Sequence, residues 1–172
     1  MNDPATAGLR KDSEGAEIPP WWVRDGGKDD LPEVARALAE LLAELTGTTP
    51  SGQELEVAAA DVIADSERGC LLVVDTVDEG IVGVLAASWQ HAIHVPGRYC
   101  ILQDLWTHPA WRSQGVGAAL VAELLERMRE EGVDRVEVGL PSERFGALAA
   151  TEAFYRENGF ALLGPRMRQV LR

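Results

Sequence analysis

The sequence predicts an α/β protein in which a mixed β-sheet carries helices on its faces. Two helical segments come first, at residues 30–47 and 51–69. A β-hairpin follows at 70–88, and beyond it a strand, a helix and a second strand succeed one another between residues 99 and 141. A hairpin supplies antiparallel pairs, whereas a strand-helix-strand unit supplies a parallel pair, so the two together indicate a mixed sheet.

The first two helices are predicted from apolar spacing and from their ends. Apolar residues recur at helical spacing between Leu31 and Leu45, with Asp30 as the expected N-cap and Gly47 just past the end. The second segment opens with Ser51 and Glu54 at the spacing of a capping box, in which each side chain bonds the other's backbone N–H.

The strands are predicted from β-branched and alternating residues. The segment 70–88 reads as two strands joined by a turn at 78–80, and 99–107 as a third strand that Pro109 stops. The segment 133–141 alternates like a half-buried strand, and 160–171 is predicted to form a final hairpin around the Gly-Pro pair at 164–165.

Two further helices complete the order. The segment 115–132 is amphipathic, and a short helix over 151–159 ends at Gly159. One stripe of the first of these helices is apolar, formed by Val116, Leu120, Leu124 and Met128. The expected order is α-α-β-β-β-α-β-α-β-β.

The chain has the length and composition of one domain. It has 172 residues, of which 46% are hydrophobic. We expect a flexible tail over 1–20, which is polar and contains glycine and proline, and a folded domain over 21–172. Apolar runs stay shorter than the roughly 18 residues of a membrane span, and the N-terminal segment lacks the apolar core of a secretory signal. Cys70 and Cys100 are expected as buried thiols, and the protein is expected in the cytoplasm.

The charge balance argues against nucleic acid as a partner. The formal net charge is −12, from 28 acidic and 16 basic residues, whereas a polyanion would need a basic surface. The acidic excess either keeps the protein soluble or steers a cationic substrate toward it.

The segment THPAWRSQGVGAAL, residues 107–120, places an arginine and two glycines directly before an apolar helix. A helix start offers unpaired N–H groups and the positive end of a dipole, so this turn suits a phosphate. A Walker loop would need Lys and Ser or Thr where Ala118 and Ala119 stand, and a dinucleotide fingerprint would need glycine in place of Leu120. Both departures argue against the nucleotide-binding motifs; what remains is a diphosphate site or a tight turn in which glycine only relieves sterics.

The wider pattern resembles the signature of the GCN5-related N-acetyltransferase (GNAT) superfamily. In that signature a strand runs into an apolar-x-Pro segment, followed by Arg or Gln, two residues, Gly, one residue and Gly or Ala. The matching positions are Thr107, Pro109, Arg112, Gly115 and Gly117, and the segment FYRENGF, residues 154–160, is similar to the family's later aromatic motif. The resemblance implies a central, mostly antiparallel, twisted sheet of about six to seven strands, splayed between strands 4 and 5 and flanked by about four helices.

The resemblance also implies acetyl coenzyme A as the cofactor. Its pyrophosphate would lie on the Arg112 side chain and on the backbone of Ser113, Gln114, Gly115, Val116, Gly117 and Ala118. The pantetheine arm would enter the gap between strands 99–107 and 133–140 and bond the backbone of Trp106 and Thr107.

The resemblance assigns catalytic roles on the same strand and on the last helix. A backbone N–H near Leu105 or Trp106 would bind the oxyanion, and Tyr155 would serve as the acid for the departing thiolate. Asp104 is one candidate for the general base; Glu143 and a chain of ordered water are the others. Gln103 stands where polyamine-type relatives carry a first acidic residue, and it is expected with Asp104 and Glu143 near the acceptor.

These observations predict an N-acetyltransferase that moves an acetyl group to a primary amine of a small molecule or peptide in a ternary complex. The alternative is a non-catalytic module that binds acyl coenzyme A. Leu148 replaces an asparagine of many relatives, which puts one cofactor contact in doubt. His91 and His94 lack the partners of a metal site, and none is expected. The alternating segment 166–171 is an edge-strand candidate for a homodimer.

Overall fold

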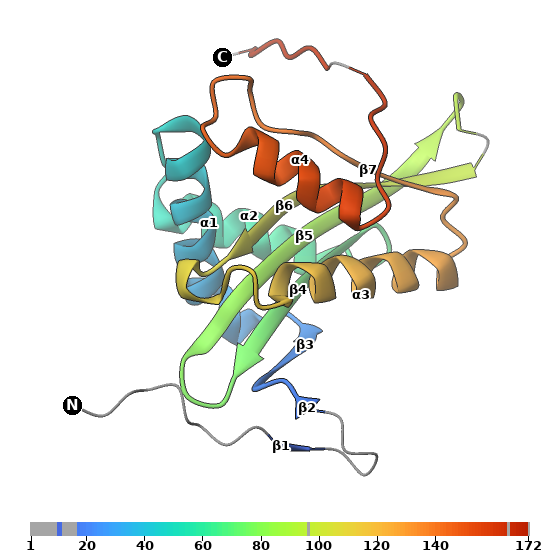
Figure 1. Cartoon of the computed structure of the whole chain (residues 1–172). Coiled ribbons are helices and arrows are strands. Elements are labelled where there is room, and N and C mark those ends of the chain that lie inside the picture. The colour runs from blue at the N-terminus through green and yellow to red at the C-terminus, as the bar shows by residue number, and fades with distance from the viewer. Residues whose placement is uncertain (1–9, 12–16, 96, 165, 172) are drawn as a thin grey trace.

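The central element of the computed structural model is a five-stranded sheet of order β3-β4-β5-β6-β7 (Figure 1). The structure describes residues 10–11, 17–95, 97–164 and 166–171. The strands are β3 (Trp21–Asp25), β4 (Gly69–Thr76), β5 (Gly80–Ala92), β6 (Gly97–Thr107) and β7 (Arg135–Val138). Neighbours pair antiparallel except β6 and β7, which are parallel, so the predicted mixed sheet is confirmed.

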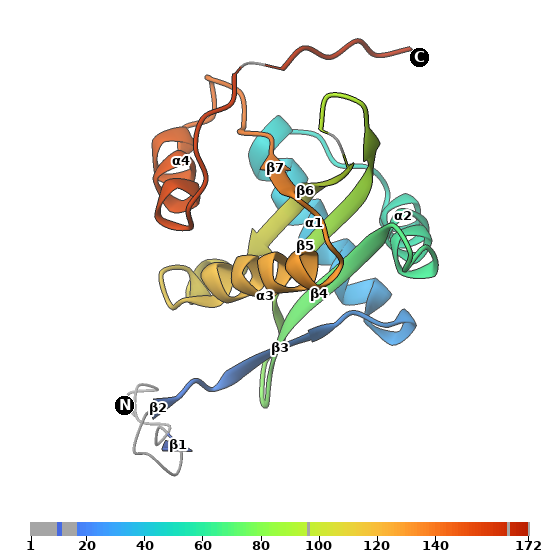
Figure 2. The same cartoon turned by 90° about the vertical axis from the view of Figure 1, so that its right-hand side faces the viewer.

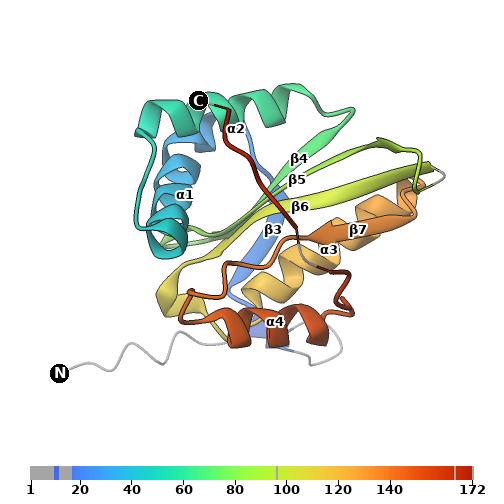
Figure 3. The ribbon, with the colours of Figure 1, turned by 90° about the horizontal axis from the view of Figure 1, so that it is seen from above.

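Helices cover both faces of this sheet, as predicted. They are α1 (Leu31–Thr46), α2 (Gly52–Ala64), α3 (Val116–Glu130) and α4 (Leu148–Glu157), with short 3₁₀ turns η1 (Lys28–Asp30) and η2 (Pro109–Trp111). Figures 2 and 3 show α1 and α2 on one face and α3 and α4 on the other. Successive strand residues point to opposite faces of the sheet and form two separate cores, one under each helix pair. No helix in the described part of the chain is both long and apolar enough to cross a membrane.

The helix ends follow their local sequence with one exception. Ser51 and Glu54 form the predicted capping box of α2, and Gly47 ends α1 in the left-handed conformation at φ 73°. Asp30 is the N-cap of α1, but its side chain makes no capping bond. It instead accepts hydrogen bonds from the Arg24 guanidinium at 2.7 and 2.9 Å, which fastens the start of α1 to β3.

A β-bulge interrupts β6 in the middle of the sheet. Asp104 pairs with Ala86 of β5 and Leu102 with Ala87, so Gln103 is the extra residue. Pairing with β7 stops at the Leu102–Val138 pair, although β6 continues to Thr107. The fourth and fifth strands of the sheet therefore diverge, as the resemblance implied, and residues 104–107 pair with β5 alone.

The sheet has fewer strands than the six to seven expected. β3, which the hydrophobic pattern did not reveal, pairs with β4, but the expected hairpin over 160–171 is not formed in its described residues. That segment is mostly exposed, including Leu162, Leu163 and Leu171, so it gains little burial to offset the ordering of a strand. Within the expected tail, Arg10–Lys11 pairs antiparallel with Glu17–Ile18 as a separate two-stranded sheet.

Candidate active site

The turn before α3 has a backbone conformation that would let a ligand approach it closely. Gly115, the N-cap of α3, adopts the left-handed conformation at φ 83°, and Ser113 adopts it at φ 61° without being glycine. A non-glycine residue in this region costs free energy and occurs where the surroundings require it. The Gln114 side chain donates back to the carbonyl oxygen of Ala110 at 2.7 Å, which helps to fix the turn.

The same turn presents unbonded N–H groups. Across the described residues, the backbone N–H groups of 113–118 make no hydrogen bond of ordinary geometry to a protein acceptor, and no side chain caps α3. The first turn of α3 carries no acidic residue that would repel an anion. Donors at a helix N-terminus, at the positive end of the dipole, form the surroundings that a phosphate requires. The predicted residues Ser113 to Ala118 therefore fit a diphosphate.

Gly117 brings α4 beside this turn. A Cβ atom at Gly117 would lie 3.4 Å from the Phe154 ring and 3.4 Å from the Thr107 hydroxyl, a tight contact that glycine avoids. The aromatic residue before Tyr155 thus packs against the start of α3 and the end of β6. The glycine turn and the aromatic motif, which lie 37 positions apart, meet at one place because of this contact.

Arg112 lies beside the turn and is already paired. Its guanidinium donates to the Glu44 carboxylate of α1 at 2.7 Å, and its Nε donates to the Thr107 carbonyl at 3.3 Å. Both ionic side chains are roughly half exposed, at 48% and 41%. An exposed pair of this kind is weak and can exchange partners. Arg112 directly precedes the turn, and a phosphate bound there would compete with Glu44 for its charge.

Asp104 lies at the bulge, where β6 has lost its neighbour β7. Its side chain is partly buried, and burial raises the pKa of the carboxyl above its ordinary value. Gln103 is exposed, in keeping with its position as the extra residue of the bulge. Leu105 packs in the core under α3, whereas the Trp106 ring is buried in the core under α1 and α2. The backbone of Leu105, Trp106 and Thr107 lies on the part of β6 that no longer pairs with β7.

Tyr155 approaches the same region from α4. The side chain is only 8% exposed, and Phe154 and Phe160 contact its ring edge to face, with centroids 5.2 and 5.5 Å away. Burial, and secondarily the charge of Asp104, raise the pKa of Tyr155 to about 12. The hydroxyl is therefore protonated at neutral pH, and the structure places it within electrostatic range of Asp104.

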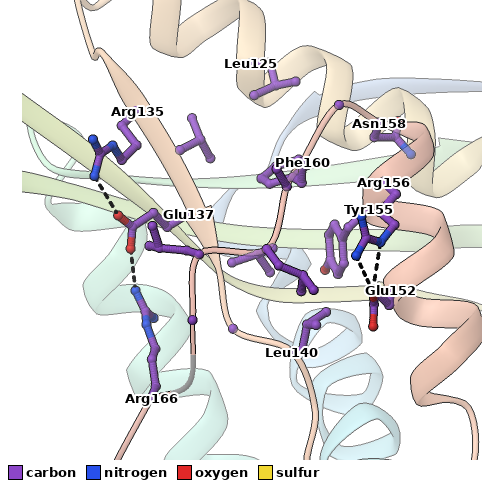
Figure 4. A pocket seen from close by; sticks show the side chains of 18 of the residues that line it. Leu125, Arg135, Glu137, Leu140, Glu152, Tyr155, Arg156, Asn158, Phe160 and Arg166 are labelled. Carbon is purple, nitrogen blue, oxygen red and sulfur yellow. Dashed lines mark hydrogen bonds and ion pairs between the residues drawn. The ribbon is translucent and has the colours of Figure 1, made fainter.

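A cavity of about 1110 Å³ lies between the C-terminal half of α3, β7, α4, residues 160–164 and Arg166. Tyr155 lines it (Figure 4), and so does the exposed Glu143. Asp104, Arg112 and the glycine turn lie outside its lining. Leu148, at the start of α4, is also part of the lining.

Sequence reasoning missed two carboxylates at this site. Glu44 lies 68 positions from its partner Arg112, and Glu137 lines the cavity from β7. The only sequence signal for Glu137 was the alternation of apolar and polar residues over 133–141, which places Glu137 on the polar side of the strand. The ring of His94, a residue expected in a loop, contacts the Tyr99 ring with centroids 5.6 Å apart.

A mixed sheet whose parallel pair separates partway along, with helices on both faces, is the architecture expected of the GNAT fold. The family model of the acetyltransferase (GNAT) family matches residues 36–160, and the chain belongs to this family. A comparison with curated proteins finds no match.

Solved structures with the same fold include several acetyltransferases. One is a possible acetyltransferase of Clostridium difficile 630, with 16% identity, TM-score 0.72, and coverage of 88% of this chain and 97% of that one. Another is glucosamine-6-phosphate N-acetyltransferase of Arabidopsis thaliana, with 14% identity, TM-score 0.71, and coverage of 88% and 99%. An acetyltransferase of Trypanosoma brucei shares 27% identity at TM-score 0.66, with coverage of 88% and 99%. Acyltransferase activity is thus the activity that the family supports.

Proposed function

We propose that this protein is an acetyl-coenzyme A-dependent N-acetyltransferase acting on a primary amine of a small molecule or peptide. The proposal rests on one observation: two features that could bind acetyl coenzyme A lie next to each other at the end of β6. The unbonded N–H groups of residues 113–118 lie at the end of the strand whose last residues, 103–107, lack a partner on the β7 side.

The binding residues follow from this arrangement. Residues 113–118 would hold the pyrophosphate, and Arg112 would add a charge-assisted contact after leaving Glu44. The unpaired edge of Leu105 to Thr107 would bond the pantetheine amides as a neighbouring strand does. When bound, acetyl coenzyme A supplies an activated acetyl thioester.

Asp104 is proposed as the base. A carboxyl whose pKa is raised by burial holds a proton more strongly than an exposed one, so Asp104 is suited to accept the proton of the attacking amine. A backbone N–H of the unpaired β6 edge, at Leu105 or Trp106, would stabilise the developing oxyanion. Glu143 also lines the cavity but is exposed, so burial does not tune it for proton transfer, which makes it the weaker candidate.

Tyr155 is proposed to assist the leaving group. With a pKa of about 12, its hydroxyl is a weaker acid than a thiol, whose pKa is about 8.5 for cysteine, so complete proton transfer to the thiolate is unfavourable. The hydroxyl would donate a hydrogen bond to the departing sulfur. Protonation of Asp104 by the amine removes one charge that raises the pKa of Tyr155, which makes Tyr155 a better donor as the C–S bond breaks.

Calorimetry with coenzyme A tests the cofactor half of the proposal. We expect binding in the micromolar range, about −8 kcal/mol, and absence of binding at millimolar coenzyme A would contradict it. The alternative, a non-catalytic module that binds acyl coenzyme A, also predicts binding, and only turnover separates the two.

We also propose that the protein forms a homodimer. Leu162, Leu163, Val170 and Leu171 of the C-terminal segment are exposed, and β7 is the edge strand of the sheet in the described chain. Exposed apolar residues near a strand edge favour association. Light scattering that finds a monomer across micromolar concentrations would contradict this proposal.

A further inference from the structure

Glu137 is a buried carboxylate that is only partly satisfied. Its side chain is 10% exposed, and it lines the cavity that Tyr155 also lines. One oxygen accepts from Arg166 at 2.7 Å, but the other is buried without a hydrogen bond in the described structure, because Arg135 approaches it only to 3.7 Å. Figure 4 shows Glu137 between these two arginines. A buried acceptor left unbonded costs free energy, and a cationic donor would remove that cost.

Glu137 shares a face of the sheet with the proposed base. Val136 and Val138 belong to the core under α3, so by alternation Glu137 points to the opposite face. Asp104 lies on that opposite face too, since it pairs with Ala86 of the core under α1 and α2. Ile101 pairs with Glu137, and the β5 partners of Ile101 and Asp104 are Ser88 and Ala86, two positions apart, because Gln103 is the extra residue of the bulge. At about 3.3 Å per residue, the two carboxylates are separated by roughly 7 Å along the strands.

We infer that Glu137 binds a second cationic group of the acceptor, so that the acceptor is a di- or polyamine whose reacting nitrogen lies near Asp104. This inference rests on the proposed function and names the substrate class of that site. A positive group several ångströms from the reacting nitrogen would donate to the unbonded oxygen of Glu137. The net charge of −12 favours the approach of such a substrate.

Arg166 occupies the position of this second cation in the present structure. It comes from the C-terminal segment, it is 51% exposed, and its guanidinium bonds Glu137 from outside. A bound amine would displace it, because an exposed arginine tether is weak and leaves one oxygen of Glu137 unbonded. Arg166 thus competes with the acceptor for Glu137.

The test uses the full-length protein with a series of α,ω-diaminoalkanes and monoamines of matched length. For each, kcat/KM with acetyl coenzyme A and the Kd by calorimetry with coenzyme A bound are measured. We expect a preference for diamines that peaks at one chain length. Glu137→Gln should lower the ratio of diamine to monoamine kcat/KM at least about tenfold, as expected when one partner of a buried charge pair is removed. Arg166→Gln should lower the KM for diamines.

The matched control is Glu152→Gln. Glu152 lines the same cavity, but it pairs with Arg156 of its own helix at 2.8 Å, so the diamine preference should persist in this variant. Coenzyme A affinity checks the folding of every variant.

The outcomes separate this inference from the proposed function. If amines are acetylated but Glu137→Gln lowers diamine and monoamine rates equally, the inference is overturned and the proposed function stands. If diamines bind in a Glu137-dependent way without turnover, Glu137 is a cation site and the proposed function fails. A wild-type protein that binds no diamine at millimolar concentration overturns the inference in either case.

Discussion

The guanidinium of Arg112 lies 2.7 Å from the carboxylate of Glu44, and this ion pair joins the turn before α3 to helix α1. The cation best placed to meet a diphosphate is therefore held by a carboxylate from the opposite side of the sheet. Any phosphate that binds the turn competes with Glu44 for Arg112.

Glu44→Gln is expected to strengthen coenzyme A binding by about two- to fivefold, because an exposed ion pair contributes about 0.2–1 kcal/mol. Calorimetry measures this change. In an Arg112→Ala background the same substitution should have no effect on affinity, since the competition no longer exists. A gain of equal size in both backgrounds would show that Glu44 acts through its general charge.

Arg112→Ala is expected to weaken coenzyme A binding about 10- to 100-fold, since hydrogen bonds to charged groups contribute about 1.5–3 kcal/mol. The melting temperature should change little, because the side chain is half exposed. A structural role for Arg112 would give the reverse pattern, with a lower melting temperature and unchanged affinity per folded molecule.

Asp104→Asn is expected to raise stability while it lowers activity. Burial raises the pKa of Asp104, so the ionised carboxyl is destabilising at pH above its folded pKa, and this penalty disappears below its unfolded pKa. The variant should therefore melt higher at pH 7, by about 2–4 °C per kcal/mol of stabilisation, and the gain should shrink as the pH falls through the folded pKa. Asp78→Asn, at an exposed turn between β4 and β5, is the control and should show no such gain. If kcat is unchanged in Asp104→Asn, Asp104 is not the base.

Gly83→Ala tests how closely β5 approaches α3. A Cβ atom there would lie 2.7 Å from Val116 and 3.1 Å from Leu120, the buried residues of the first turns of α3. Overpacking of this kind costs about 1–3 kcal/mol, which chemical denaturation measures. Because the clash displaces the first turn of α3, coenzyme A affinity should fall as well. Gly52→Ala, where the added atom meets nothing within 4 Å, should change neither quantity appreciably.

Local signals made the helices and the glycine turn before α3 predictable. The capping box of Ser51 and Glu54, the left-handed Gly47 and the glycines before α3 are set by neighbours in the sequence, and each is found in the structure. The mixed sheet followed from the hairpin and from the strand-helix-strand unit.

Features that depend on distant residues were not predictable. β3 is a five-residue strand that pairs with β4, where Arg24 lies opposite Val73, 49 positions later, so no local pattern marks it. The partner of Arg112 comes from α1, and Glu137 is recognisable as buried only once the C-terminal segment lies over it. Alternation alone suggested a hairpin over 160–171, but alternation does not supply the burial that a strand needs.

Tyr155→Phe keeps the ring packing against Phe154 and Phe160 and removes only the hydroxyl. We expect kcat to fall about 10²- to 10³-fold, as on loss of one hydrogen-bond donor to a developing negative charge, with coenzyme A affinity little changed, provided that chemistry limits turnover. Tyr99→Phe, which removes a hydroxyl bonded to Gln90 at 2.8 Å, is the control and should keep its kcat. Near-normal kcat in the Tyr155 variant, with a demonstrated rate-limiting chemical step, would contradict the role of this hydroxyl.

The release of free thiol from acetyl coenzyme A, followed across a panel of primary amines, tests the proposed activity most directly. Amine-dependent thiol release, with one acetylated amine formed per thiol, is the result that the account predicts, and cationic amines should lose kcat/KM as ionic strength rises. If the protein binds coenzyme A but releases no thiol with any amine, it is a binding module and the account of its catalysis is wrong.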